Sequence, residues 1–161
     1  GHEREYAMQV LNDVYPADAA QIEALREKGP DGPVFMVNLL KFKDRAEYED
    51  GRATTLTGRD AYQIYGRAVS EILPKFGGRA VFAADVTFLS LGRVEELWDE
   101  VAIAAYPDRG SMVRMSFSPE WREASVHRTA GLKGQLNIET QLTQQDVLPD
   151  WLVMLAQGMK A

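Results

Sequence analysis

The chain has 161 residues, with 24 acidic and 18 basic side chains and a formal charge of −6. This length suits one core rather than two full domains. The acidic balance disfavours nucleic acid or an anionic membrane as the main partner, because both require a basic surface. The absence of cysteine excludes disulfides, thiolate catalysis and zinc–thiolate sites, and it fits a cytoplasmic protein.

Both ends of the chain have the character of additions to a central domain. Gly1-His2 resembles the scar of a cleaved purification tag. Residues 3–30 predict an N-terminal helical extension that stops at Gly29-Pro30. Residues 143–161 predict a helical tail that packs on the domain or on a partner chain, and its apolar part is too interrupted to span a bilayer. The domain itself is expected over residues 31–142.

Hydrophobic periodicity gives the elements of this domain in chain order. An apolar run predicts a strand over 34–42, and an exposed polar loop follows over 44–57. Helical spacing over 58–76 ends at a Gly-Gly pair, and strands are predicted over 79–91 and 97–106. Two short helices, over 111–117 and 118–127, precede a last strand over 136–142. This βαββαβ order predicts an α+β protein of ferredoxin-like type, with one antiparallel sheet and helices on one face.

Alternation along the strands separates the side chains into two faces. One face is apolar apart from Asp99, and we expect the helices to cover it. Its members are Phe35, Val37, Leu39, Phe82, Ala84, Val86, Phe88, Leu97, Val101, Ile103 and Ala105. The other face mixes apolar residues with Asn38, Asp85, Thr87 and Glu100, which is too apolar for water and too polar for a sealed core. We therefore expect this mixed face to meet another subunit and to enclose a partly polar cavity.

Several short motifs, in the right order, resemble a known family over roughly residues 16–141. They are Asp31-Gly32-Pro33-Val34, Val37-Asn38-Leu39-Leu40-Lys41-Phe42, Gly58-Arg59-Asp60-Ala61-Tyr62, Phe76-Gly77-Gly78-Arg79, Trp98-Asp99-Glu100-Val101 and Pro119-Glu120-Trp121 with His127-Arg128-Thr129-Ala130. The chain resembles family 1330 of the bacterial domains of unknown function, in the dimeric α/β-barrel superfamily. That resemblance implies a homodimer in which two ferredoxin-like sheets face each other, and it implies no agreed reaction. Superfamily relatives include cofactor-free monooxygenases, isomerases, decarboxylases and haem enzymes, so the fold alone does not assign chemistry.

Two residues are the candidate catalytic groups. Asn38, an amide inside an apolar strand, can donate to a ligand carbonyl or enolate, or it can simply bond neighbouring backbone or the partner chain. His127 titrates near neutrality and suits proton transfer, with Arg128 beside it to hold an anionic substrate. The same pair also fits a plain interaction with the C-terminal dipole of its helix.

The candidate ligand-binding residues are carboxylates and aromatic side chains. Asp85 and Glu100 share the mixed face on neighbouring strands, where they form either an acid–base pair or a contact with an arginine. Aromatic side chains can line a cavity for a flat ligand, although they can equally belong to the core. These are Tyr62, Tyr65, Trp98 and Trp121.

These observations lead to one main hypothesis and two alternatives. The first is a homodimer that binds a small organic molecule of aromatic or enolic kind, with cofactor-free proton transfer or oxygenation as the chemistry if it is an enzyme. The second is a non-catalytic binding or assembly module whose polar sheet residues only determine how the dimer is aligned. Haem or flavin use is the third. The chain has one histidine outside the tag scar and lacks nucleotide-binding motifs. We therefore expect neither a metal site nor a nucleotide cofactor.

Overall fold

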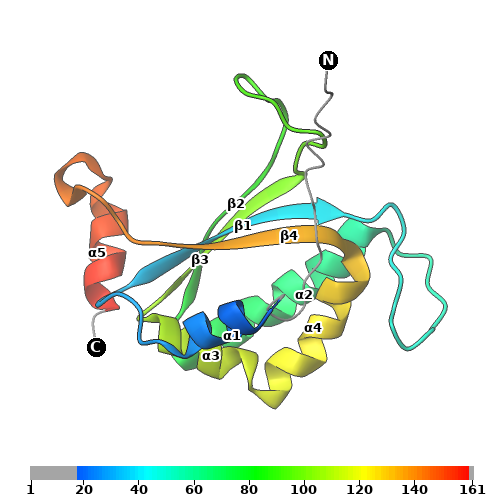
Figure 1. The fold of residues 1–161 in the computed structure, drawn as a ribbon, viewed down its shortest axis with the longest axis horizontal. Coiled ribbons are helices and arrows are strands. Elements are labelled where there is room, and N and C mark those ends of the chain that lie inside the picture. The colour runs from blue at the N-terminus through cyan, green and yellow to red at the C-terminus, as the bar shows by residue number, and fades with distance from the viewer. Residues whose placement is uncertain (1–17, 160–161) are drawn as a thin grey trace.

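Four strands form one antiparallel sheet in the order β2-β3-β1-β4 (Figure 1). The computed structural model describes residues 18–159. The strands are β1 (Val34–Phe42), β2 (Arg79–Asp85), β3 (Glu100–Tyr106) and β4 (Leu132–Thr140). A helical crossover follows β1 and another follows β3, so this is the ferredoxin-like βαββαβ fold, and the predicted fold class is confirmed.

Three α-helices and a 3₁₀ turn cover one face of this sheet (Figure 1). They are α2 (Gly58–Ile72) with η1 (Leu73–Phe76), α3 (Arg109–Ser116) and α4 (Pro119–Gly131). The first helix begins with a capping box, in which the Thr57 hydroxyl accepts from the Asp60 N–H and the Asp60 carboxylate accepts from the Thr57 N–H. The last begins with Ser118 as N-cap and Pro119 in the first turn. Local sequence therefore determines where these helices start.

Three of the four predicted strands have different bounds in the structure, and the strand predicted over 97–106 begins at Glu100. The strand predicted over 79–91 ends at Asp85, and the segment 86–99 leaves the sheet as a projecting connection (Figure 1). Its apolar members Phe88 and Leu91 are exposed, so the alternation of apolar residues there does not reflect strand pairing. The last strand begins at Leu132 rather than at residue 136, because buried Leu132 continues directly from the end of α4.

The prediction of which face the helices cover is wrong. The helices pack on Val34, Met36 and Tyr106, which belong to the mixed face together with Asn38 and Glu100. The apolar face is left open on the other side of the sheet, where Phe82, Leu136 and Ile138 are between 43% and 52% exposed. Alternation assigns side chains to a common face, but it carries no information about which element covers that face. In this chain the helices supply polar partners for the mixed face, as described below.

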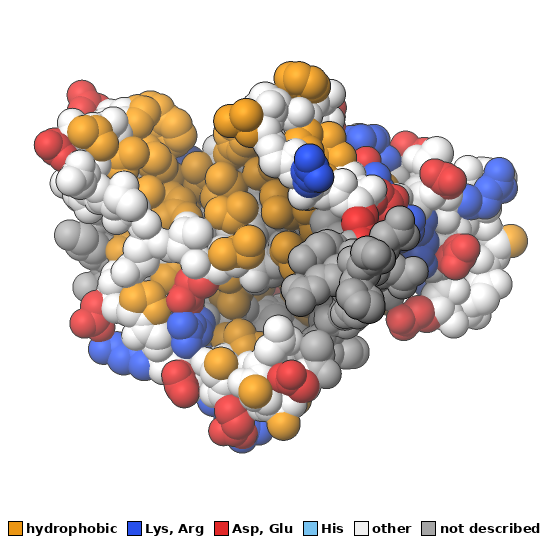
Figure 2. All heavy atoms as spheres, turned by 45° about the horizontal axis from the view of Figure 1, so that its top comes forward, with side chains coloured by type: hydrophobic (Ala, Val, Ile, Leu, Met, Phe, Trp, Pro, Cys, Tyr) orange, Lys and Arg blue, Asp and Glu red, His pale blue; other side chains and the backbone are white. Residues whose placement is uncertain are grey.

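The tail helix α5 (Asp150–Gly158), preceded by η2 (Gln145–Val147), lies on part of the open face. Ala156 and Met159 pack there against Phe35 and Ala105. Figure 2 shows hydrophobic side chains gathered over the rest of this face, in the hollow between α5 and the projecting segment 86–99. The described chain thus covers one end of the open face and leaves the remainder exposed.

At the N-terminal side, the helix α1 (Ala19–Arg26) begins at the N-cap Asp18 and buries none of its residues. The predicted extension over 3–30 is therefore helical in this part, whereas the tag scar and the rest of the extension before residue 18 lie outside the described residues. Arg109 secures α1, since its Nη1 donates to the Ala24 carbonyl at 3.0 Å while its Nε donates to Glu139 of β4 at 2.7 Å. Within residues 18–159, none of the helices has the length and apolar character that a bilayer crossing requires.

Candidate functional site

A cavity of about 380 Å³ lies between the sheet and the helices α2, α3 and α4. We call it the helix-side cavity. Strand residues form its floor, α2 and α4 supply aromatic walls, and Met112 of α3 closes one side. The residues that carry its chemistry are Asn38, Tyr62, Tyr65, Glu100, Trp121, Arg128, Gln135 and Asn137. A mostly apolar hollow with a few converging polar groups is the usual form of a small-molecule site.

A network of amides crosses the floor of this cavity. The Asn38 Oδ1 accepts from the Gln135 Nε2 at 2.8 Å and from the Asn137 Nδ2 at 2.7 Å. The Asn38 Nδ2 donates to the carbonyls of Ala102 at 3.2 Å and Met36 at 3.3 Å. Because both ends of the amide have partners within the chain, Asn38 holds the two β4 side chains in place rather than offering a free donor.

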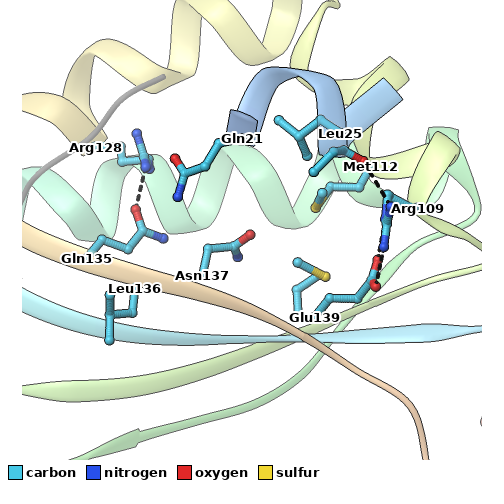
Figure 3. Close-up of a pocket in the computed structure, with 11 residues that line it drawn as sticks. Gln21, Leu25, Arg109, Met112, Arg128, Gln135, Leu136, Asn137 and Glu139 are labelled. Carbon is cyan, nitrogen blue, oxygen red and sulfur yellow. Dashed lines mark hydrogen bonds and ion pairs between the residues drawn. The ribbon is translucent and has the colours of Figure 1, made fainter. Parts of the chain in front are cut away.

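Arg128 places a positive charge at the end of this network. It is 8% exposed, and its Nη2 donates to the Gln135 Oε1. Arg128 also lines a second cavity of about 400 Å³ between α1, α3 and β4 (Figure 3). In Figure 3, Gln21 of α1 lies beside Arg128 and Gln135, and the ion pair between Arg109 and Glu139 lies toward the other end. The guanidinium therefore stands where the two cavities meet.

Tyr62 and Tyr65 form the aromatic wall on α2. The Tyr62 ring packs between those of Phe42 and Tyr65, with both centroid distances 5.4 Å, and Tyr65 accepts a hydrogen bond from the Trp121 Nε1 at 3.1 Å. Burial raises the pKa of the Tyr62 hydroxyl far above its ordinary value, while the Arg128 charge lowers it and the Glu100 charge raises it. Both tyrosines consequently stay protonated at neutral pH, so Tyr62 can act as a hydrogen-bond donor to a bound molecule.

Glu100 supplies the carboxylate of the cavity wall. It pairs in register with Asp85 across β2 and β3, and Arg59 of α2 lies 3.7 Å from it and 2.8 Å from Asp85. The Glu100 side chain is only 20% exposed, whereas that of Asp85 is 69% exposed. Burial raises the pKa of Glu100, with the charge of Arg59 lowering it and that of Asp85 raising it. A carboxylate with a raised pKa in a cleft is suited to accept or donate a proton.

His127 stands apart from this cavity. Its Nδ1 lies 2.7 Å from the Tyr48 hydroxyl in the segment between β1 and α2, and the guanidinium of Arg52 lies 4.5 Å from the centre of the Tyr48 ring. Burial lowers the pKa of His127, and the charge of Arg52 lowers it further. His127 and Arg128 are neighbours in sequence, but a helix turns by about 100° per residue, so their side chains point in different directions and contact different residues. The histidine here anchors part of the loop 44–57.

The structure thus brings together five of the residues singled out from the sequence. Asn38, Tyr65, Glu100, Trp121 and Arg128 all line the helix-side cavity. His127, Asp85 and Trp98 do not line it: His127 contacts Tyr48, Asp85 lies exposed beside Arg59, and Trp98 precedes β3.

Sequence reasoning missed two polar members of the floor. Gln135 and Asn137 lie two residues apart on β4, and their register places them beside Leu40 and Asn38. Their spacing of two residues could have indicated that they share one face of the strand. The predicted strand began at Leu136, however, so Gln135 was left outside it. Among residues 18–159, no group of three or more histidine, aspartate or glutamate side chains is placed to hold a metal ion.

Comparison with known proteins confirms the family that the sequence motifs indicated. The family model "Domain of unknown function (DUF1330)" matches residues 51–140. Two crystal structures of RPA0582, one of the methylated protein and one described as a protein of unknown function from Rhodopseudomonas palustris, are 32% and 30% identical to the chain. They have TM-scores of 0.73 and 0.72, and each alignment covers 83% of this chain and 96% or 99% of the other.

A plant protein with much lower identity has the same fold. At3g17210 from Arabidopsis thaliana has 12% identity and a TM-score of 0.51, with 69% of this chain and 96% of that chain covered, which shows a common fold. No curated protein matches the chain. Because the family model spans more than half of the sequence and RPA0582 is similar over nearly its whole length, this chain belongs to the DUF1330 family.

Proposed function

We propose that this protein is a homodimer that binds a small, flat organic molecule in the helix-side cavity. The observation that carries the proposal is the cavity itself, a space of about 380 Å³ with aromatic walls and a polar floor. Tyr65 and Trp121 provide flat apolar surfaces, and Glu100, Arg128 and the Tyr62 hydroxyl provide orienting polar contacts. Asn38 contributes by holding Gln135 and Asn137 in position.

The open face of the sheet supports the dimer. Among residues 18–159, its exposed side chains include the apolar Phe82, Leu136 and Ile138. At its margin Lys41 forms an ion pair with Asp99 at 3.2 Å. Exposed apolar patches of this kind mark interaction surfaces in soluble proteins. A second copy is the simplest partner, because two equal apolar faces are complementary to each other under two-fold symmetry. The exposed Phe88 and Leu91 of the segment 86–99 extend this surface.

A second candidate function, cofactor-free proton transfer, is favoured by Glu100 in particular. Its raised pKa and its place in the cavity wall suit a general acid or base. His127, the residue that the sequence suggested for this role, lies outside the cavity. A non-catalytic binding or assembly module is the alternative in which Glu100 makes contacts with the ligand but exchanges no proton.

Gly66 permits a direct test of the cavity. It lines the helix-side cavity, and a Cβ built on it meets no atom within 4 Å. Gly66→Leu should fill the cavity and abolish retention of any co-purified small molecule, measured by native mass spectrometry, while leaving the dimer intact. Gly66→Ala is the matched control and should retain the molecule. Retention by Gly66→Leu equal to that of the wild type would contradict binding at this place.

The dimer is tested separately on the open face. Ile138, 44% exposed on β4, should not tolerate a charge in the dimer, so Ile138→Asp should yield a monomer by size-exclusion chromatography with light scattering. Val126 on α4 is 41% exposed but lies on the helical side, and Val126→Asp should remain dimeric. A wild-type protein that is monomeric at all concentrations would refute the proposed dimer.

A further inference from the structure

The helix α1 stands over the place where the two cavities meet. Leu25 lines both the helix-side cavity and the second cavity, and Met112 of α3 also lines both of them. Gln21 and Leu25 are four residues apart, so they lie on one side of α1, and Figure 3 shows them directed toward the floor on β4. The space for a ligand thus continues from the helix-side cavity to beneath α1.

Packing holds α1 only weakly. None of its eight residues is buried. Between α1 and the start of α3 lies a further hollow of about 950 Å³, whose walls include Leu25, Glu27, Asp108 and Val113. A helix as short as this has little stability apart from its tertiary contacts, so its detachment from the domain costs little free energy.

Arg109 is placed to act as a latch for this helix. Its Nε and Nη2 donate to the two carboxylate oxygens of Glu139 on β4, at 2.7 and 2.8 Å, and this paired contact fixes the guanidinium to the sheet. Its Nη1 donates to the carbonyls of Ala24 at 3.0 Å and Glu27 at 3.4 Å, at the C-terminal end of α1. A positive charge at this end also interacts favourably with the helix dipole. The sheet therefore holds the latch, and α1 leaves when the contact with Nη1 breaks.

The chain has a hinge directly after α1. Gly29 has a φ of 73°, which other residues adopt only with strain, and a Cβ there would lie 2.7 Å from the Arg109 guanidinium. Two residues further on the chain is anchored again, because the Asp31 carbonyl accepts from the Gln141 Nε2 at 2.7 Å. A change in the direction of α1 is therefore absorbed by residues 27–30.

We infer that α1 is the lid of the ligand site, that it opens about residues 27–30 when its contact with Arg109 breaks, and that the site extends beneath it. This inference rests on the proposed function, because a lid requires a site below it, and it adds the route by which the ligand enters. With the lid docked, Leu25 covers Met112, and with the lid open, Met112 is reached from solvent.

The chain has no cysteine, so a single introduced thiol reports on access to this place without background. Met112→Cys puts the thiol where the two cavities meet. Its alkylation by iodoacetamide, followed by mass spectrometry, should be at least tenfold slower than that of Ser70→Cys, an exposed position on α2. Adding Arg109→Gln should raise the rate at position 112 about tenfold, because a hydrogen bond from a charged group to α1 is lost.

Matched variants distinguish a lid from a general loosening of the structure. Arg122→Gln, at an exposed arginine of α4, should leave the rate at position 112 unchanged, and Arg109→Gln should leave that of Ser70→Cys unchanged. Asp18→Ala removes the N-cap of α1, whose carboxylate accepts a backbone N–H of the first turn at 2.9 Å. It should raise the rate at position 112 about fivefold without altering Arg109, and it keeps the test available if Arg109→Gln does not fold.

The outcomes separate this inference from the proposed function. Alkylation at position 112 as fast as that of Ser70→Cys overturns the lid, and so does a rate that neither Arg109→Gln nor Asp18→Ala raises. Neither result affects the proposed function, which depends on Gly66→Leu abolishing the retention of small molecules. Full retention by Gly66→Leu overturns the ligand site and the lid together, whatever the rates of alkylation.

Discussion

The start of α2 and the end of α4 approach each other so closely that we expect Gly58 not to tolerate a larger residue. A Cβ added there would lie 2.1 Å from the Lys43 carbonyl oxygen and 2.6 Å from that of Gly131. Both are main-chain atoms, so no side-chain rotation can relieve the clash. Two hydrogen bonds tie the same backbone together, Gly58 N–H to the Lys43 carbonyl at 3.1 Å and Lys43 N–H to the Gly131 carbonyl at 2.9 Å.

Gly58→Ala should therefore destabilise the protein by about 3 kcal/mol. Losing the two hydrogen bonds costs about 1 kcal/mol each, and forcing packed elements apart costs about 1–3 kcal/mol. The better helix propensity of alanine returns at most about 1 kcal/mol. Because Tyr62 and Arg128 lie on the two helices that meet here, the displacement should also disturb the helix-side cavity.

Urea denaturation measures this effect. With an m value of about 2 kcal/mol/M, a loss of about 3 kcal/mol lowers the unfolding midpoint by roughly 1.5 M. Gly66→Ala, in the same helix but with nothing within 4 Å of the new Cβ, is the control and should raise the midpoint slightly, since glycine inside a helix costs about 0.5–1 kcal/mol relative to alanine. A Gly58→Ala midpoint equal to that of the wild type would refute the claim that helix approach at this point limits side-chain size.

Three further predictions concern caps, charges and the histidine. Asp108→Ala removes the N-cap of α3, whose carboxylate accepts from the Ser111 N–H at 2.7 Å, and should cost about 1 kcal/mol in urea denaturation. Arg109→Gln removes the contact that holds α1 to β4, so the amides of α1 should exchange with deuterium faster while those of α2 stay unchanged, and equal rates in α1 would count against this anchoring role. Burial and Arg52 hold the pKa of His127 below 6.5, so the unfolded chain takes up the proton first as the pH falls. Stability from this residue is complete above pH 6.5 and is lost below it, and the fall in midpoint from pH 7.5 to 5 should be smaller in His127→Gln.

Much of the fold could be predicted because its signals are local. The apolar run at 34–42, the Ser118-Pro119 start and the Gly77 stop, which adopts a φ of 75°, act through their own backbone and near neighbours. Asp85 and Glu100 were assigned to one face by alternation, and the register confirms that they are paired. Tyr65 and Trp121 were candidates because aromatic side chains can line a cavity for a flat ligand, and they meet in the structure.

The arrangement of the site depended on contacts that no local signal contains. Alternation could not tell which face the helices cover. In the structure the helices cover the mixed face, where Arg128 meets Gln135 and Arg59 meets Asp85. His127 and Arg128 looked like one functional pair in the sequence, but the helix directs them to different places.

By itself, the sequence determined the order of the elements, the caps that start the helices and the side chains that share each face of the sheet. Only the tertiary structure decided which face became the cavity and which stayed open, and that Glu100 and Gln135 lie on either side of Leu40. The physical reason is that backbone conformation follows from neighbouring residues, whereas burial and charge at a site follow from residues far apart in the sequence. Asn38 and Asn137, for example, meet only after their strands have paired.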